Sequence, residues 1–579
     1  MTKQNPILIK ILAFWVCLLM LTQAAISASD HKPEISFDIW DWTAPAQDLD
    51  LFRTWVEDLA DLGFTRLELS VPWRLLEPEP RHYDLRWLEE RIRICEHAGL
   101  GMRLRINSYY GGATPDWYTG DRWLDAQGNS VPQGPPSIMD ERFWNHYGPL
   151  CETIAALGKG RDILYNAFIG IHAELKYADW WSYDEATLTA WRAAIQAPRP
   201  AWLREVVGEL PLPERPEIPP ATQGVPDTIP TSLAFIAFRE QCWREAVLCF
   251  EKAIRKGDPD ARISAPLGES FRRQSASMAN LDYWGLTRGA SQVVHSYDFF
   301  RHAKDPAWMA AASVHAFQGI TGLPVVFEFD GTPTLEGLGY SIPHLLALGQ
   351  AAASAGAGLK FANNSYSKTL PSQQPLLREL IDIWRHDWKP QQPSPGQDTI
   401  LLFCSKWANY TYRESTEWLH EAQFGMYKLF RDAQVPVRII NEDNLGEDLS
   451  GYRALYAAFS PRTLMPASTQ QQLSTLPLLL IEDFMDIPEP EATGEGITAG
   501  LAQIRASTST CPLGPQDVSN LGPEYQYALT LENKKLLAYR PKHVVMGYPV
   551  GSLYLHDELP TVHQGLVLWA LGHDSRGAH

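Results

Sequence analysis

In Leu323-Pro-Val-Val-Phe-Glu-Phe-Asp-Gly331 a short apolar run leads directly into a glutamate, Glu328. The same arrangement occurs earlier, in Asn166-Ala-Phe-Ile-Gly-Ile-His-Ala-Glu-Leu-Lys-Tyr177, where the glutamate is Glu174. Apolar runs that end in a polar residue are typical of buried parallel strands, with the polar group at the carboxyl end of the strand. In barrels of parallel strands, that end carries the functional groups. We therefore expect Glu174 and Glu328 to lie at the same end of a barrel.

Eight strand candidates alternate with helical stretches before residue 390. Such repeated alternation predicts a (β/α)8 TIM barrel, in the α/β class, rather than a doubly wound sheet. Glu174 and Glu328 would follow the fourth and seventh strands. The other six candidates are Glu34–Trp40, Thr65–Ser70, Met102–Asn107, Ala261–Pro266, Gln292–Tyr297 and Gly358–Asn363.

Residues 1–28 differ from the rest of the chain in composition. Lys3 and Lys10 precede an apolar run, and small residues follow it. This pattern predicts a cleavable signal peptide, because the apolar run is too short to span a bilayer. We expect a secreted or periplasmic protein, with no membrane span after the signal is removed.

The remaining chain divides into a barrel at 29–388, a linker at 389–397 and a smaller domain at 398–579. The linker is rich in proline and glutamine. After it, strand and helix patterns restart and predict a flavodoxin-like α/β domain with C-terminal strands. Within the barrel, the proline-dense stretch Pro198 to Pro230 predicts an irregular excursion over its top. In the smaller domain we expect strands at 400–404, 435–441, 454–459 and 478–481, a helix at 414–433, late strands within 534–554 and a last helix at 562–571.

Charge and composition exclude some function classes. The formal net charge is −18, which argues against a general nucleic-acid binder. No close pair of cysteines is present, so a zinc site is not indicated. The chain has 21 tryptophans, and aromatic rings stack on the apolar faces of sugars. That abundance suits a protein that handles carbohydrate, although core packing explains tryptophans equally well.

The stretch Val71-Pro-Trp-Arg-Leu-Leu-Glu-Pro-Glu-Pro-Arg-His-Tyr-Asp-Leu-Arg-Trp87 is the most specific local motif. It resembles the W-x-x-x-E-P-x-x-G-x-Y-[DN] stretch that follows the second strand in clan A glycoside hydrolases. The glycine of that pattern is absent, and Arg81 stands in its neighbourhood. We expect this stretch to order its loop and pack the next helix.

With the two strand-end glutamates and the smaller domain, the chain resembles, at a distance, the glycoside hydrolase family 42 β-galactosidases. The resemblance implies retaining hydrolysis of a β-glycoside, with Glu174 as acid/base and Glu328 as nucleophile. Carboxyl pairs suit this reaction because one must protonate the leaving oxygen while the other attacks the anomeric carbon. It also implies a carbohydrate substrate, no cofactor, and a homotrimer formed with the help of the smaller domain.

Further residues fall where they could line a sugar site. Tyr297, after the sixth strand, would hydrogen-bond the nucleophile. Trp180 and Trp181 would offer stacking platforms. The remaining candidates are Trp40, Asp41, Arg105, Asn107, His172, His295 and Asn363.

Several alternatives stay open at this stage. Glu174 could instead form a structural ion pair with Lys176 or Arg103, and Glu328 could be displaced by Asp330 or Glu269. The family has an Asn before its acid/base, where this chain has Ala173. That difference motivates a second hypothesis, a non-catalytic carbohydrate-binding barrel.

A third hypothesis is an inverting glycosidase, because residues 173–177 resemble the Gly-Glu-Leu-Arg-Tyr stretch of β-amylases. The sugar, the linkage, and endo or exo action are left open.

Overall fold

The computed structural model describes residues 33–571 with internal gaps. The gaps are 42, 131–133, 169, 171–173, 178–179, 221–226, 269–280, 297–305, 331–341, 363–369, 390–395, 397, 414–416, 484–525, 532–533, 541, 547–549, 551–553, 555–566 and 568–570. The predicted signal peptide, most of the predicted last helix, and the site candidates His172, Tyr297 and Asn363 lie outside the described residues.

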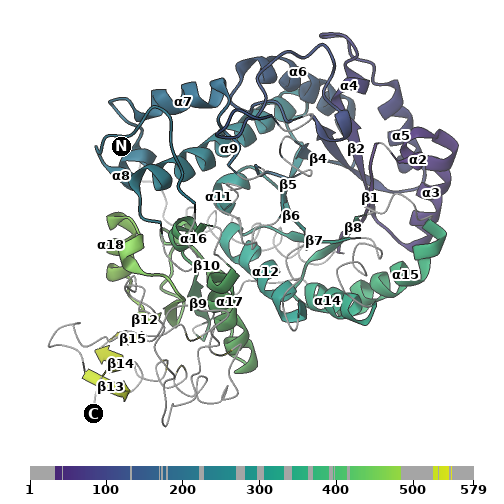
Figure 1. Cartoon of the computed structure of the whole chain (residues 1–579). Helices are drawn as coiled ribbons and strands as arrows, with labels where there is room; N and C mark the ends of the chain where they lie inside the picture. Colours follow the sequence, from purple (N-terminus) through teal and green to yellow (C-terminus); the bar gives the residue numbers. More distant parts are fainter. Residues whose placement is uncertain are drawn as a thin grey trace, which may run out of the picture.

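Eight parallel strands close into a barrel, in which each strand pairs with the next and the eighth pairs with the first. The predicted TIM barrel is confirmed, and Figure 1 shows its strands as an inner ring surrounded by helices. The strands are β1 (Ile35–Ile39), β2 (Arg66–Pro72), β3 (Gly101–Asn107), β4 (Ile163–Phe168), β5 (Arg262–Leu267), β6 (Gln292–Ser296), β7 (Val325–Asp330) and β8 (Gly358–Ala362). The helices after them, in the same order, are α3 (Leu49–Leu62), α5 (Arg86–His97), α6 (Glu141–Gly158), α9 (Pro230–Gly257), α11 (Tyr283–Leu286), α12 (Pro306–Thr321), α14 (Ile342–Ser354) and α15 (Leu370–Asp387).

The fourth strand differs from its prediction. It ends at Phe168, whereas the sequence was expected to continue as a strand toward Glu174. After the strand, Gly170 packs so closely on the returning chain that a Cβ there would lie 2.0 Å from the carbonyl oxygen of Glu174. A glycine permits this approach, so the chain folds back and Glu174 sits on a loop.

The loop after β2 explains the Glu-Pro motif. The buried carboxylate of Glu77 accepts hydrogen bonds from Trp73 Nε1 and from the backbone N–H of Arg81, both at 2.6 Å. Arg81 has a φ of 62°, the left-handed conformation that glycine adopts most easily. The arginine therefore holds the conformation that a glycine would favour, and the predicted ordering role of the motif is confirmed.

The proline-dense insertion is partly regular. It contains a short helix, α8 (Ala201–Val207), where the sequence predicted irregular chain. Trp191 Nε1, on α7 (Glu185–Ile195), donates to the carbonyl of Pro213 at 3.0 Å and fastens the following segment. Figure 1 shows α7 and α8 beside α9, outside the ring of strands, rather than over the top of the barrel.

The smaller domain is built on a seven-stranded sheet of order β10-β9-β11-β12-β15-β14-β13. Its first five strands are parallel and follow the 2-1-3-4-5 order of flavodoxin-like folds, which confirms the predicted α/β architecture. The strands are β9 (Ile400–Phe403), β10 (Val437–Ile440), β11 (Ala454–Ala457), β12 (Leu479–Asp483), β13 (Gln526–Leu531), β14 (Lys534–Arg540) and β15 (His543–Met546). Its helices are α16 (Lys406–Tyr412), α17 (Glu417–Asp432) and α18 (Ala467–Thr475), so the helix predicted at 414–433 is preceded by a separate helix that the sequence did not predict.

At the carboxyl end of this sheet, a glutamate side chain binds the N-terminus of a helix. Glu442, just after β10, accepts hydrogen bonds from the hydroxyl of Ser405 and, at 2.9 Å, from the backbone N–H of Lys406. These donors form the N-terminus of α16, which follows β9 next to the point where the strand order reverses. An internal carboxylate thus caps the helix there.

The two domains meet where β10 packs on α12. A Cβ on Gly319 would lie 2.1 Å from the carbonyl oxygen of Ile439, so only glycine fits this crossing. Arg438 Nη2 donates to the carbonyl of Gly319 at 2.9 Å, and Asn444 Nδ2 donates to that of Ile320 at 2.9 Å. The edge strand of the second sheet is thereby covered by a barrel helix, as Figure 1 also shows.

Candidate active site

The barrel lumen is lined by charged side chains. Along β2 and β3 polar and apolar residues alternate, and the polar ones point inward. Arg105 on β3 pairs with Asp38 on β1, and Lys360 on β8 pairs with Glu68 on β2 at 3.0 Å. Because neither pair joins neighbouring strands, both contacts cross the lumen. The apolar layers that usually fill such barrels are replaced here by ion pairs.

Glu68 is the centre of this network. Its carboxylate contacts Arg103 Nη1 at 2.8 Å, Arg105 Nε at 2.9 Å and Lys360 Nζ at 3.0 Å. Burial alone would raise the pKa of Glu68, but Lys360, Arg105 and Arg103 together lower it well below its ordinary value. Nearby Asp38 is also buried, and burial outweighs Arg105 and Lys360 to raise its pKa to about 6.

Glu328 lies in β7, in register with Lys360 on β8 and Ser296 on β6. Its Oε2 atom is 2.8 Å from Lys360 Nζ. The sequence predicted this glutamate at the end of the seventh strand, and the structure places it two residues before that end, facing the lumen through its ion pair with Lys360.

Glu174 reaches the barrel from the loop after β4. The N–H of Leu175 donates to the carbonyl of Pro266 at 2.9 Å, which holds the loop against the carboxyl end of β5. Gly268 makes room for the carboxyl group, since a Cβ there would lie 1.6 Å from Glu174 Oε1. The carboxylate forms an ion pair with the buried Lys176, the first of the two structural pairings considered from the sequence. Arg103, the second, is bound instead to Glu34 and Glu68.

Exposure separates these two glutamates from the other carboxyls near them. The side chain of Glu174 is 12% exposed and that of Glu328 is 17% exposed, whereas Asp38 and Glu68 are fully buried. Of these four carboxyls, Glu174 and Glu328 are therefore the two that solvent reaches.

Four predicted site residues lie together at the ends of β1 and β3. The guanidinium of Arg105 stacks on Trp40, 3.8 Å from the ring centroid. Asp41 accepts a hydrogen bond from Ser70 Oγ at 2.5 Å, and burial raises the pKa of its carboxyl. Asn107 accepts hydrogen bonds from the N–H groups of the next two tyrosines and donates to the carbonyl of Tyr110 and, at 3.5 Å, to Asp41 Oδ1.

His295 is placed elsewhere. It lies one residue before the end of β6, on the outer face of the wall, where its ring contacts Phe317 of α12 and Phe327 of β7. Burial lowers its pKa to about 3, so the ring stays neutral in this apolar setting. The structure thus does not bring His295 to the two glutamates, contrary to the expectation from sequence.

The two tryptophans after Glu174 are partly buried. The guanidinium groups of Arg239 and Arg413 lie 4.9 Å and 5.8 Å from the ring centroid of Trp180. Both Trp180 and Trp181 pack on the hydrophobic core. Their use as stacking platforms stays a prediction.

Sequence reasoning missed Lys360, Glu68 and Asp38 as parts of this site. The signal was present in Arg66-Leu-Glu-Leu-Ser70 and Met102-Arg-Leu-Arg-Ile-Asn107, where polar residues occupy every second position. In a strand covered by helices on its outer face, such alternation indicates a polar lumen.

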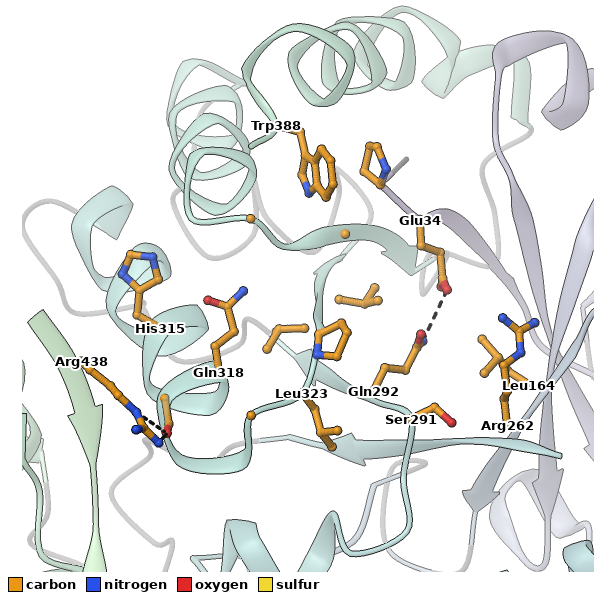
Figure 2. A pocket seen from close by; sticks show the side chains of 18 of the residues that line it. Glu34, Leu164, Arg262, Ser291, Gln292, His315, Gln318, Leu323, Trp388 and Arg438 are labelled. Carbon is orange, nitrogen blue, oxygen red and sulfur yellow. Dashed lines mark hydrogen bonds between the residues drawn. The ribbon is translucent and has the colours of Figure 1, made fainter. Parts of the chain in front are cut away.

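A cavity of about 840 Å³ lies at the opposite end of the barrel. Figure 2 shows it between the amino ends of the barrel strands and the second domain, with Glu34, Gln292 and Arg438 among its lining residues. Neither Glu174 nor Glu328 lines it. In such barrels this end serves stability rather than chemistry, so we place the candidate site at the other end.

Two negative findings apply to the described part of the chain. It holds no group of three or more His, Cys, Asp or Glu side chains arranged to bind a metal ion. It also has no helix with the length and apolar character needed to cross a bilayer. The five cysteines within it are unpaired.

No protein-family model and no curated protein sequence matches this chain. Solved structures do match its fold. The β-galactosidase from Bacillus circulans sp. alkalophilus aligns with a TM-score of 0.62 at 11% identity, over 94% of this chain and 89% of that one. The β-galactosidase from the psychrophilic Marinomonas ef1 aligns with a TM-score of 0.60 at 12% identity, over 92% and 91% of the two chains. An exo-β-1,4-mannosidase from Opitutaceae bacterium strain TAV5 aligns with a TM-score of 0.52 at 12% identity, over 92% and 96%.

These alignments extend over both domains, so the shared fold is that of a TIM barrel followed by a smaller α/β domain. The sequence resemblance to family 42 β-galactosidases therefore agrees with the fold. At this level of identity the comparison concerns architecture, and the chemistry has to be argued from the site.

Proposed function

We propose that this protein is a retaining β-glycoside hydrolase that acts on β-galactosides. The observation that carries the proposal is the pair of partly exposed carboxyls, Glu174 beyond β4 and Glu328 in β7, above a fully buried charge network. The fold shared with solved β-galactosidases and a mannosidase supports the substrate class.

In the proposed reaction, Glu328 attacks the anomeric carbon while Glu174 protonates the departing glycosidic oxygen. Glu174 then removes a proton from water, which hydrolyses the glycosyl-enzyme with retention of configuration. Retention requires carboxyl groups roughly 5–5.5 Å apart, whereas inversion requires about 6.5–9.5 Å.

Export and assembly are part of the same proposal. The composition of residues 1–28 supports a cleaved signal and a secreted or periplasmic location. The resemblance to family 42 supports a homotrimer built with residues 398–579. Mass spectrometry of the exported protein and its molar mass by light scattering test these two points.

The test uses Glu174→Gln and Glu328→Gln on a panel of aryl β-glycosides that includes β-galactosides. We expect each variant to lose about 10³-fold or more of kcat, since each removes a group needed in the transition state. Glu96→Gln, in an exposed ion pair with Arg161, is the matched control and should keep full activity. Turnover near that of the native enzyme in either test variant would refute the role assigned to that glutamate.

The stereochemistry is tested separately. NMR of the first-formed sugar should show the retained anomer. The inverted anomer would support the inverting alternative and would make Glu328 a base that activates water.

A non-catalytic carbohydrate-binding barrel is the second candidate, favoured by one observation. Both glutamates are ion-paired with buried lysines, an arrangement that also serves structure alone. Calorimetric binding of oligosaccharides without product release across a broad panel of glycans would support this alternative.

A further inference from the structure

Lys360 is the cation in direct contact with Glu328. Its Nζ atom lies 2.8 Å from Glu328 Oε2, 3.0 Å from Glu68 Oε1 and 3.7 Å from Asp38 Oδ2. These carboxyls come from β7, β2 and β1, so the ammonium group is held from three directions. Its side chain is 3% exposed, which leaves it little freedom to turn toward solvent.

The surroundings keep Lys360 protonated. Burial would lower the pKa of its ammonium group, but Glu328 and Glu68 outweigh burial and the nearby Arg105, so the pKa is raised above its ordinary value. Glu68 is itself held ionised by Arg103 and Arg105, which anchors one side of Lys360 permanently. The lysine therefore presents a fixed positive charge to Glu328.

We propose that Lys360 is the positioning residue for the nucleophile Glu328. It binds Oε2 and orients the carboxylate so that Oε1 attacks. The inference rests on the proposed function, because it assigns a role within that same site. Charged groups that face Lys360 are Glu328, Glu68, Asp38 and Arg105.

The test isolates the attack of Glu328 with 2,4-dinitrophenyl 2-deoxy-2-fluoro-β-D-galactopyranoside. A carboxylate oxygen forms a bond to C1, and the bond from C1 to the aryl oxygen breaks with its electron pair. Dinitrophenolate leaves as an anion, so this step needs no proton from Glu174. The rate of dinitrophenolate release is measured against the concentration of this reagent, and mass spectrometry of peptides locates the adduct.

In Lys360→Met we expect the maximal labelling rate to fall by about 100-fold with the half-saturating reagent concentration unchanged, because nothing then fixes the direction of the carboxylate. Lys360→Arg should recover part of that loss and label about tenfold more slowly than the native enzyme, because a longer planar cation displaces the carboxylate. Lys256→Met, in an exposed pair with Glu152, is the matched control and should leave both values unchanged.

An unchanged maximal labelling rate in Lys360→Met would overturn the inference while leaving the proposed function intact. If the Met variant does not fold, Lys360→Arg decides, and an unchanged labelling rate with it would equally overturn the positioning role. Failure of the native enzyme to label at Glu328, with active hydrolysis of other glycosides, would instead contradict the assigned nucleophile.

Discussion

Strands β2 and β3 of the barrel carry charged side chains at alternate positions, whereas β9 of the second domain is buried and apolar along its whole length. Both are parallel strands with helices packed outside. They differ in their second face, which looks into the barrel lumen in one case and onto another layer of helices in the other. The inner face of this barrel thus carries charge on β2 and β3, whereas neither face of β9 does.

Two buried carboxyls, Glu68 in the barrel and Asp483 in the second domain, are accommodated in different ways. Glu68 is surrounded by three cations, and these hold its pKa low against the effect of burial. Asp483, at the end of β12, receives hydrogen bonds from Phe459 N–H, Tyr456 Oη and Val550 N–H, and no cation contacts it among the described residues. Burial raises the pKa of Asp483 to about 7. In these two cases cations balance Glu68 in the barrel and a proton neutralises Asp483, whereas Glu482, beside Asp483 on β12, is buried with Arg462 and His543.

The largest expected effect comes from Glu68→Gln. Three buried cations would lose a shared counter-ion, and we expect the free energy of unfolding to fall by about 3–5 kcal/mol. Because the pKa of Glu68 is lowered in the fold, its contribution exists above the unfolded value near 4.3 and is lost as pH falls. The difference in free energy of unfolding between the native and variant proteins, measured with urea, should therefore become smaller at acidic pH. A constant gap would show that the charge of Glu68 does not matter.

Asp483→Asn tests the opposite arrangement. A raised pKa means that this group favours the fold below about pH 4 and that the advantage disappears as pH rises through 7. This contribution of protonated Asp483 to the free energy of unfolding amounts to roughly 4 kcal/mol, and the Asn variant should lack it. Unfolding of the two proteins from pH 5 to 8 measures the difference. Parallel stability curves would contradict the assignment.

Leu402→Ala probes the apolar strand β9, where Leu402 is fully buried. We expect a loss of about 3 kcal/mol from the cavity and the lost burial. Unlike the two carboxyl variants, its effect should not depend on pH, and thermal unfolding at pH 5 and pH 8 checks this. A clear pH dependence of the loss in stability would mean that a titrating group interacts with this strand.

The smallest expected effect concerns the contact between the two regions. Gly319→Ala would force α12 away from β10, at a cost of about 2 kcal/mol. Calorimetry should show the transitions of the two domains moving apart. Gly148→Ala on α6 is the matched control, because a Cβ there meets nothing within 4 Å. Equal unfolding transitions in the two variants would show that the contact between α12 and β10 tolerates a methyl group.

Much of the fold followed from sequence because strand and helix patterns are local. The six strand ranges predicted outside the glutamate loops agree with the structure to within two residues at each end. The strand before Glu174 was extended too far, since a glycine turn within an apolar run leaves the run looking continuous. The extra helix α16 was missed because it is short and lies directly after β9.

The residues of the site were harder to predict from the sequence, because the direction of each side chain has to be known. Successive residues in a strand face opposite sides, so an error of one residue moves a side chain from the lumen to the outer wall. His295 and Lys360 both lie in barrel strands, yet His295 packs against a helix and Lys360 reaches Glu328. The ion pair of Lys360 with Glu68 joins residues 292 positions apart, and no local pattern specifies it.

The carboxylate of Glu442 on the N-terminus of α16 has a consequence for the second domain. In flavodoxin-like sheets, ligands bind beyond the carboxyl ends of the strands where their order reverses. Here a side chain of the same polypeptide already occupies the donors at that place. A tethered group competes at an effective concentration on the order of millimolar or higher. A diffusing phosphate would have to displace the Glu442 carboxylate, which the chain itself holds at this place. The second domain thus carries its own anion at the position where flavodoxin-like domains bind a ligand.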